Sequence, residues 1–192
     1  MEMVVMISEE EARRKILETI QRLPKRTASL SSALDCFSAQ DLVARLPMPG
    51  FDNSAMDGYA VVASSRRMGG RLRVIGEQPA GVDRGIRISP GEAARIFTGA
   101  PMPAGADAVV MLEYTQTIRD EIEIFRAVAD GENIIHIGED VAQGQVVQAK
   151  GSLIRPAEIG GLLALGITSV RVVKKPIVGL ISTGDEVIDP SQ

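Results

Sequence analysis

Four polar loops of this 192-residue chain carry the residue types that could do chemistry. The first, Met48–Val61, reads MPGFDNSAMDGYAV and holds Asp52 and Asp57 between Pro49-Gly50 and Gly58. Pro and Gly favour turns, and Asn, Asp and Ser hold loops by hydrogen-bonding to the nearby backbone. The segment therefore predicts a rigid polar loop with two carboxylates. A surface turn held by its own Asx side chains is the alternative interpretation of this segment alone.

The other three loops each combine an oxygen-bearing side chain with a glycine, which permits close approach of the backbone. They are Ile96–Pro103 with Thr98 and Gly99, then Gly138-Glu139-Asp140, and then Thr183-Gly184-Asp185-Glu186. Hard oxygen ligands suit Mg²⁺, which usually binds through one or two carboxylates and substrate phosphates. Thr98, with the neighbouring backbone N–H groups, could donate to an oxyanion. These residues indicate divalent-cation and phosphate chemistry, although no spacing rule brings the loops together.

Composition excludes several other classes of function. A net charge of −4 argues against a nucleic-acid-binding surface. Cys36 is the only cysteine and His136 the only histidine, so neither a disulfide framework nor a multi-histidine zinc site is expected. We expect Cys36 to be a small buried hydrophobe. Walker, Rossmann and GxSxG motifs are absent, and no apolar run reaches membrane-spanning length. We therefore expect a soluble, cytoplasmic protein without nucleic-acid or membrane partners.

The elements that must position these loops begin with an amphipathic helix. Ser8 and Glu11 form a capping box, with Ile7 at the staple position. The helical run then ends at Pro24. Its apolar stripe needs a partner surface, either elsewhere in the protein or in a second copy, and consists of Ala12, Ile16, Ile20 and Leu23. A second, short helix is predicted over residues 32–40.

Residues 58–147 have a sequence pattern typical of a β protein. Short β-branched and aliphatic runs are separated by Gly, Pro and Asp at roughly ten-residue spacing, which is typical of a compact all-β unit, either a barrel or a sandwich. The predicted strands include residues 72–75, 86–88, 108–112 and 121–125.

Helical periodicity returns after Lys150. Pro156 opens a predicted helix and Gly166 follows its end; the expected apolar face is Ile159, Leu162, Leu163 and Leu165. A strand over residues 170–173 should follow. The apolar run Pro176–Ile181, followed by a polar glycine-containing loop, is typical of a buried parallel strand in an α/β sheet. Because the rest of such a sheet is missing, we expect this chain to be the N-terminal portion of a longer one.

Four segments of the chain resemble the molybdopterin molybdenumtransferase family, the MoeA proteins and the E domain of gephyrin. The order and spacing of these segments follow the family from about residue 8 onward. They read PGFDNSAMDGYAV (49–61), RIFTGAPMPAGADAVVMLE (95–113), NIIHIGEDV (133–141) and IGGLLALGITSVRVVKKPIVGLISTGDEV (159–187).

The resemblance implies a function in molybdenum cofactor biosynthesis. Such a transferase inserts molybdate into adenylylated molybdopterin and releases AMP, with Mg²⁺ assisting. It also implies a cytoplasmic homodimer, and a MogA-type adenylyltransferase as a further partner. The implied fold is α+β and multidomain: an N-terminal helix (1–24), a helical and β linker or dimerisation domain (25–45 and 145–174), an inserted all-β domain (46–144), and the first strand of a truncated MogA-like α/β domain (175–192).

The resemblance further assigns roles to residues of the four loops. The active cleft would form between one subunit's α/β domain, with Asp185 and Glu186, and the other subunit's inserted β domain, with Asp57, Thr98 and Asp140. We assign Asp57, Asp140 and Glu186 to the metal, and count them with Thr98 as catalytic. Substrate contacts fall to Ser54, Thr98, Gly99 and Asp185. Asp52, Asn53 and Ser54 are also expected to brace the first loop.

Two departures from the family pattern affect these expectations. Ile135-His136-Ile137 stand where the family often has an Arg before Gly-Glu-Asp, so an anion-contacting guanidinium is missing. The region after Cys36-Phe37 is also a few residues shorter. The residues expected to hold the pterin would lie beyond Gln192. We therefore expect residues 1–192 alone to be inactive. The alternative function is a non-catalytic dimerisation or scaffold module of the gephyrin E-domain type.

Overall fold

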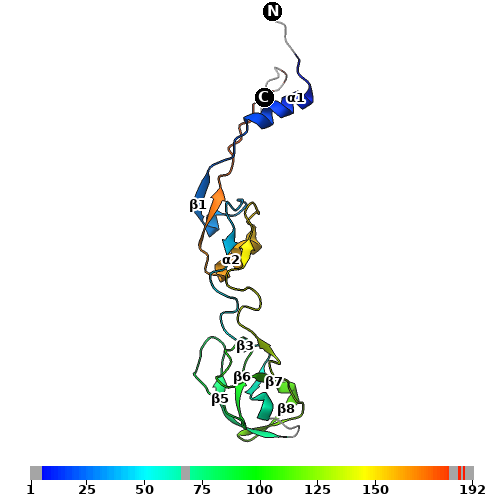
Figure 1. Cartoon of the computed structure of the whole chain (residues 1–192), viewed down its shortest axis with the longest axis vertical. Coiled ribbons are helices and arrows are strands. Elements are labelled where there is room, and N and C mark those ends of the chain that lie inside the picture. Colours follow the sequence, from blue (N-terminus) through cyan, green and yellow to red (C-terminus); the bar gives the residue numbers. More distant parts are fainter. Residues whose placement is uncertain (1–5, 66–69, 182–185, 187, 189–192) are drawn as a thin grey trace, which may run out of the picture. The chain divides into compact units, whose positions relative to one another are not determined.

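The computed structural model describes residues 6–65, 70–181, 186 and 188 (Figure 1). The chain divides into two compact units: Met1–Leu42 with Gln148–Gln192, and Val43–Val147. Among the described residues, no helix has both the length and the apolar character that a membrane span requires.

The first unit begins with helix α1 (Glu9–Thr19). The predicted N-cap is confirmed, because the Ser8 hydroxyl accepts the backbone N–H of Glu11 at 3.2 Å. The helix does not continue to Pro24. It ends at Thr19, whose hydroxyl donates to the Ile16 carbonyl at 2.8 Å, and Ile20 is already extended. No residue of α1 is buried. Of the predicted apolar stripe, Ile16, Ile20 and Leu23 are exposed and Ala12 is half buried.

Strand β1 (Lys25–Ser29) pairs antiparallel with β12 (Ser169–Val173) in the same unit. The register runs from Lys25 opposite Val173 to Ser29 opposite Ser169. Ala28, Val170 and Val172 are buried, so one face of this ribbon packs into the unit and the other is solvated. Cys36 is also buried, as expected of a small hydrophobe.

The short helix predicted over residues 32–40 is wrong. Only a 3₁₀ turn forms, η1 (Leu30–Ser32), and the chain then runs irregularly with Asp35 at a φ of 58°. The N–H groups of Asp35 and Ser38 donate to the carbonyls of Ile154 and Ser152, each at 2.9 Å. These distant acceptors replace the i−4 carbonyls that a helix would have used.

Helix α2 (Pro156–Ala164) forms where predicted. Glu158 accepts the Arg155 N–H at 3.0 Å, and the hydrogen-bonded Arg155 guanidinium lowers the pKa of Glu158 to about 2. Gly166, at a φ of 73°, and Ile167 donate to the carbonyls of Leu163 and Leu162, which is a Schellman end. Leu162 and Leu165 are buried, but Leu163 is half exposed and does not belong to the buried face.

The strand predicted over Pro176–Ile181 is not formed. The structure has no regular element at residues 174–181, and Ile177 and Leu180 are fully exposed. An isolated strand leaves its N–H and C=O groups without partners, and among the described residues no neighbouring strand supplies them.

The second unit is built on one open, mixed sheet rather than a closed barrel or a sandwich. Its six strands lie in the order β7-β4-β6-β5-β9-β8, and all neighbours are antiparallel except β5 and β6. The strands are β4 (Gly58–Val61), β5 (Arg71–Gln78), β6 (Glu92–Ile96), β7 (Ala108–Met111), β8 (Thr115–Ile118) and β9 (Glu121–Ile124). The run 86–88, predicted as a strand, makes only an isolated bridge from Arg87 to Ala104.

Short pairings complete the secondary structure. β3 (Asn53–Ser54) pairs with β10 (Ile134–Ile135), and β2 (Leu42–Val43) pairs with β11 (Val146–Gln148). Two 3₁₀ turns, η2 (Ala63–Ser65) and η3 (Leu112–Tyr114), follow β4 and β7.

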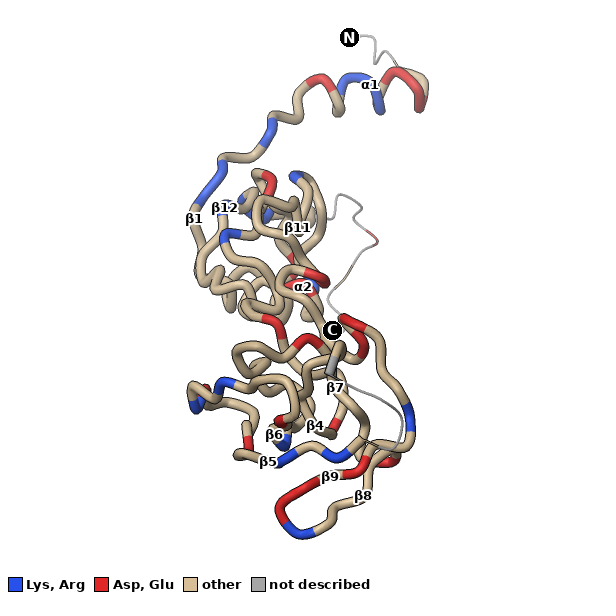
Figure 2. Tube along the Cα trace, turned by 60° about the horizontal axis from the view of Figure 1, so that its bottom comes forward, with Lys and Arg blue, Asp and Glu red and all other residues tan. Residues whose placement is uncertain are grey.

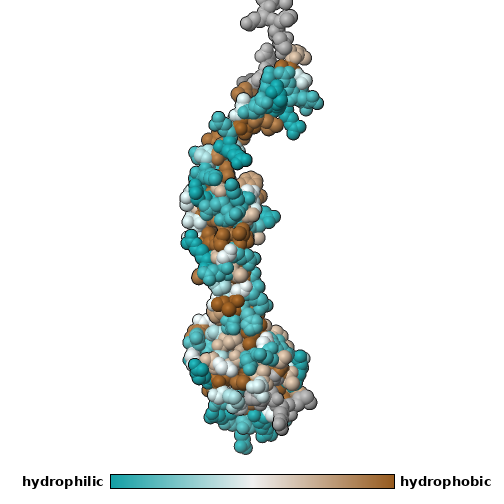
Figure 3. Space-filling model, viewed as in Figure 1, coloured by the Kyte–Doolittle hydropathy of each residue, from teal (hydrophilic) through white to brown (hydrophobic). Residues whose placement is uncertain are grey.

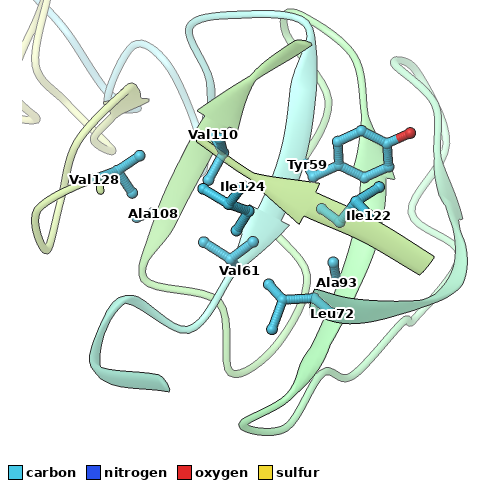
Figure 4. Packing of buried hydrophobic residues seen from close by; sticks show 9 residues of the cluster. All are labelled: Tyr59, Val61, Leu72, Ala93, Ala108, Val110, Ile122, Ile124 and Val128. Atoms are coloured by element: carbon cyan, nitrogen blue, oxygen red, sulfur yellow. The ribbon is translucent and has the colours of Figure 1, made fainter. Parts of the chain in front are cut away.

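The two faces of the sheet bury different residues, as the alternation of a strand requires. One cluster includes Tyr59 and Val61 of β4 and is shown in Figure 4. Its other members are Leu72, Ala93, Ala108, Val110, Ile122, Ile124 and Val128. Ala60, between Tyr59 and Val61, belongs to a second cluster with Ile96, Ala100 and Val109. β4 is therefore an interior strand of the sheet, buried on both faces.

Gly58→Ala should strongly destabilise the second unit. A Cβ at Gly58 would lie 2.0 Å from the Val110 carbonyl oxygen, so β4 and β7 could not keep their spacing. Overpacking of this kind costs roughly 1–3 kcal/mol, and we expect the upper end because the clash is with backbone. Urea unfolding of the chain measures the loss. Gly50→Ala is the matched control, since its Cβ would meet nothing within 4 Å; equal stability of the two variants would contradict the argument.

Candidate functional site

The side chains of Asp57 and Thr98 meet although they are far apart in sequence. Asp57 precedes β4, and Thr98 lies just beyond the end of β6, whose Ile96 is opposite Gly58 in the antiparallel register. The backbone N–H and the hydroxyl of Thr98 both donate to Asp57 Oδ1, at 2.8 Å and 2.9 Å. Both residues are exposed. The pairing of two strands thus brings two of the predicted site residues into direct contact.

These contacts keep Asp57 ionised. The Thr98 backbone N–H, and then the Thr98 hydroxyl, hold the pKa of Asp57 below its ordinary value, and the positive charge of Arg95 acts in the same direction. Both bonds use Oδ1, so Oδ2 carries no bond to the described protein groups. Asp57 therefore presents one exposed carboxylate oxygen to solvent.

Arg95 is a site residue that the sequence analysis missed. It lies opposite Tyr59 in the β4–β6 register, and its guanidinium stacks on the rings of Tyr59 (5.4 Å) and Phe97 (4.6 Å). It also donates to the Gly58 and Ile96 carbonyls at 2.7 Å and 3.0 Å. The available signal was the Arg-x-Phe spacing, which places both side chains on one face of a strand.

Ser54 links the first loop to the second through its backbone. Its N–H donates to the Ala100 carbonyl at 3.0 Å, and its carbonyl accepts the N–H of Gly99 at 2.8 Å. Its side chain is fully buried, and the hydroxyl donates to the Met56 carbonyl at 2.6 Å. The Ser54 hydroxyl thus faces the backbone of its own loop rather than solvent.

The backbone N–H groups around Thr98 already have acceptors within the protein. Thr98 donates to Asp57, Gly99 to Ser54, and Ala100 to the carbonyl of Phe97 at 2.9 Å. An anion at this turn would have to compete with these bonds. The Thr98 hydroxyl donates its proton to Asp57. The hydroxyl oxygen therefore remains available as a hydrogen-bond acceptor, rather than as a donor, toward solvent.

The third loop docks against the start of the first. Asp52 Oδ1 accepts the N–H of Ile137 at 2.7 Å, and Gly138 donates to the Pro49 carbonyl at 2.9 Å. The Asp140 N–H donates to the Met48 carbonyl at 3.1 Å. The Asp140 carboxylate is exposed and makes no hydrogen bond or ion pair with the described residues. The first three loops therefore form one hydrogen-bonded group.

The His136 ring lies beside Asp52, with its Nδ1 3.5 Å from Asp52 Oδ2. Ile135 of β10 pairs with Asn53 and is half buried, at the place where an arginine was expected from the family pattern.

The fourth loop belongs to the first unit. Glu186 lies there in an exposed turn, while Thr183, Gly184 and Asp185 lie outside the described residues. Over the part of the chain that is described, no group of three His, Cys, Asp or Glu side chains converges as a metal site. The exposed Asp57 and Asp140 carboxylates are hard oxygen ligands of the kind that Mg²⁺ takes, commonly one or two at a time with substrate oxygens and water.

Comparison with known proteins shows which protein family this chain resembles. A family model described as the MoeA N-terminal region (domain I and II) matches residues 7–166. The molybdopterin molybdenumtransferase of Bacillus subtilis (strain 168) is 37% identical over 191 aligned residues, covering 95% of this chain and 44% of that protein. The molybdopterin molybdenumtransferase of Staphylococcus aureus (strain MSSA476) is 38% identical over 184 residues, covering 93% of this chain and 44% of that protein.

A solved structure is similar over nearly the same extent. The crystal structure of a molybdopterin biosynthesis MoeA protein from Pyrococcus horikoshii OT3 matches with a TM-score of 0.86 at 38% identity. The match covers 95% of this chain and 50% of that chain. This chain thus spans about half the length of the relatives it matches.

Replacing Thr98 with Val should raise the pKa of Asp57 part of the way to its ordinary value. Val removes the hydroxyl donor but keeps the backbone N–H, the larger of the two contributions. Because the folded-state pKa is lowered, the stability that ionised Asp57 contributes is present above its unfolded-state pKa. It is lost as the pH falls through the folded-state pKa, so Thr98→Val should lose it at a higher pH. Carboxyl ¹³C NMR titration measures the pKa, and Thr98→Ser, which keeps the hydroxyl, should match the parent. An unchanged pKa in Thr98→Val would contradict the assignment.

Proposed function

This chain belongs to the MoeA family, whose N-terminal region it matches over residues 7–166, and from this premise we propose that it acts in molybdenum cofactor biosynthesis. The proposed reaction inserts molybdate into adenylylated molybdopterin and releases AMP. Molybdopterin molybdenumtransferase is the name carried by the relatives from B. subtilis and S. aureus. A MogA-type adenylyltransferase would supply the adenylylated molybdopterin. The cytoplasmic location of the protein stays a prediction.

The contact between Asp57 and Thr98 is the observation that carries this proposal. Both residues lie on the family-matching loops, and their hydrogen bonds fix the Asp57 carboxylate as an anion with Oδ2 exposed. A phosphoanhydride and molybdate are themselves anions, so a carboxylate can serve them only across a cation. We propose that Asp57 and Asp140 of one subunit, together with Glu186 of the other subunit, hold Mg²⁺. When bound, Mg²⁺ would offset the charge of the phosphate oxygens and of the leaving AMP.

In this proposal the remaining residues orient Asp57, contact the substrate or support the first loop. Thr98 holds Asp57 in one rotamer through two bonds and leaves its oxygen lone pairs for substrate or metal-bound water. Gly99, exposed at a φ of 79°, would let a substrate approach the backbone. Asp185 is proposed as a substrate contact, and Ser54 would act on the substrate through the loop it braces.

Asp57→Asn should reduce AMP release from adenylylated molybdopterin by about a hundredfold or more, since an amide oxygen binds Mg²⁺ far more weakly. The assay uses the product of the complete reading frame, with molybdate present and the Mg²⁺ concentration varied. Part of the loss should be recovered at high Mg²⁺. Asp120→Asn is the control, because it removes an exposed carboxylate of the same unit outside the four loops.

Two results would overturn this proposal. Full Mg²⁺-dependent AMP release by Asp57→Asn would remove Asp57 from the chemistry. No turnover by the parent protein, despite substrate binding, would favour the non-catalytic scaffold of the gephyrin E-domain type.

A homodimer is the second part of the proposal. Ile16 and Leu17 at the end of helix α1, and Ile20 just after it, are each more than half exposed. Figure 3 shows brown, hydrophobic atoms at the surface in this part of the chain. Single exposed apolar residues are common, but a contiguous stripe on a helix without buried residues favours a protein partner.

Ile16→Glu should therefore shift the chain from dimer to monomer at micromolar concentration, because a charge in an apolar interface loses hydration without gaining a partner. Sedimentation equilibrium gives the mass of each species. Gln21→Glu adds the same charge at an exposed position just after α1 and should leave the dimer intact. A parent chain that sediments only as a monomer would refute the role of the stripe.

A further inference from the structure

A groove in the first unit combines positive charge with an apolar floor. Its volume is about 370 Å³. Three cations line it, Arg22, Lys25 and Lys150, together with the apolar side chains of Leu23, Ala39 and Val173. We call these six residues the cationic groove.

The backbone brings three distant segments side by side to form the cationic groove. Lys25 lies opposite Val173 in the β1–β12 pair. The Val173 N–H donates to the Phe37 carbonyl at 3.0 Å, and the Gly151 N–H donates to the Ser38 carbonyl at 2.8 Å. Lys25 and Lys150 are therefore held on a hydrogen-bonded framework.

Positive side chains are concentrated in this region. Four more exposed cations lie close by in sequence. Arg26 is in β1, Arg171 is in β12, and Lys174 and Lys175 directly follow β12. None of these seven cations takes part in an ion pair in the described part of the chain, whereas six other Lys and Arg side chains do. Asp41 lies beside Lys150, but its Oδ1 accepts the Lys150 backbone N–H at 2.7 Å. Figure 2 shows blue segments between α1 and β1 and on β12.

We propose that the cationic groove binds an acidic peptide segment of a partner protein. Carboxylates of an extended peptide would meet the cations at the rim, and its aliphatic side chains would cover Leu23, Ala39 and Val173. A single-stranded nucleic acid fits less well, because such sites stack bases on aromatic side chains and none lines this groove in the described residues. The net charge of −4 also disfavours nucleic acid. This proposal does not depend on the molybdenum reaction.

Fluorescence anisotropy tests the proposal with the full chain and a fluorescein-labelled peptide in which Glu alternates with Leu. Binding should saturate and should weaken as NaCl is added, since exposed charges are screened. The triple variant R22Q/K25Q/K150Q should bind roughly tenfold more weakly, because each exposed charge pair contributes a factor of about two. A peptide with Ser in place of Leu should also bind more weakly than the Leu peptide.

The matched control is R45Q/R87Q/R119Q, which removes three exposed charges in the second unit and should keep the parent affinity. Equal weakening in both triple variants would reduce the effect to net charge and overturn the proposal. Absence of saturable binding, or tighter binding of a labelled oligo-dT, would overturn it as well. If the first triple variant unfolds, K25Q and K150Q singly should each weaken peptide binding about twofold.

Discussion

The candidate site depends on the register of β4 between β6 and β7. Gly58 opposes Ile96 on one side and Met111 on the other, and its missing side chain lets the Val110 carbonyl approach. This register fixes where the two polar segments beyond the strand ends meet. Had β4 slipped by one residue, its side chains would exchange faces and Asp57 would lose Thr98. The geometry of a surface carboxylate is thus decided by the packing of a strand buried on both faces.

Carboxylates hold the loops together by accepting backbone N–H groups from other segments. Asp57 accepts from Thr98 and Asp52 from Ile137, each across a long sequence separation. Charge-assisted bonds of this kind order loops that have no apolar core of their own. The same chemistry divides the acidic residues by role: Asp52 is committed to the framework, and the Asp140 carboxylate is left to solvent. Asp57 does both, because one oxygen is bonded and the other is exposed.

Local elements were predictable from the sequence because their determinants are close in sequence. Ser8 with Glu11 started α1, and Pro156 with Gly166 bounded α2. Short β-branched and aliphatic runs correctly predicted three strands of the second unit, β5, β7 and β9. The short helix at 32–40 and the strand at 176–181 were wrong for one reason: whether an apolar run becomes helix, strand or neither depends on the partners available to its backbone. Those partners lie far away in sequence or, for residues 176–181, are not among the described residues.

The sequence by itself determined which residues could form the site, because the four loops and their family resemblance can be identified without the structure. Only the tertiary structure decided which of them meet. It joined Asp57 to Thr98, added Arg95 through cross-strand stacking on Tyr59, and buried the hydroxyl of Ser54. It also occupied the N–H groups of the Thr98 turn. The physical reason is that side-chain chemistry is encoded residue by residue, whereas contact across strands follows from register and burial, which belong to the whole unit.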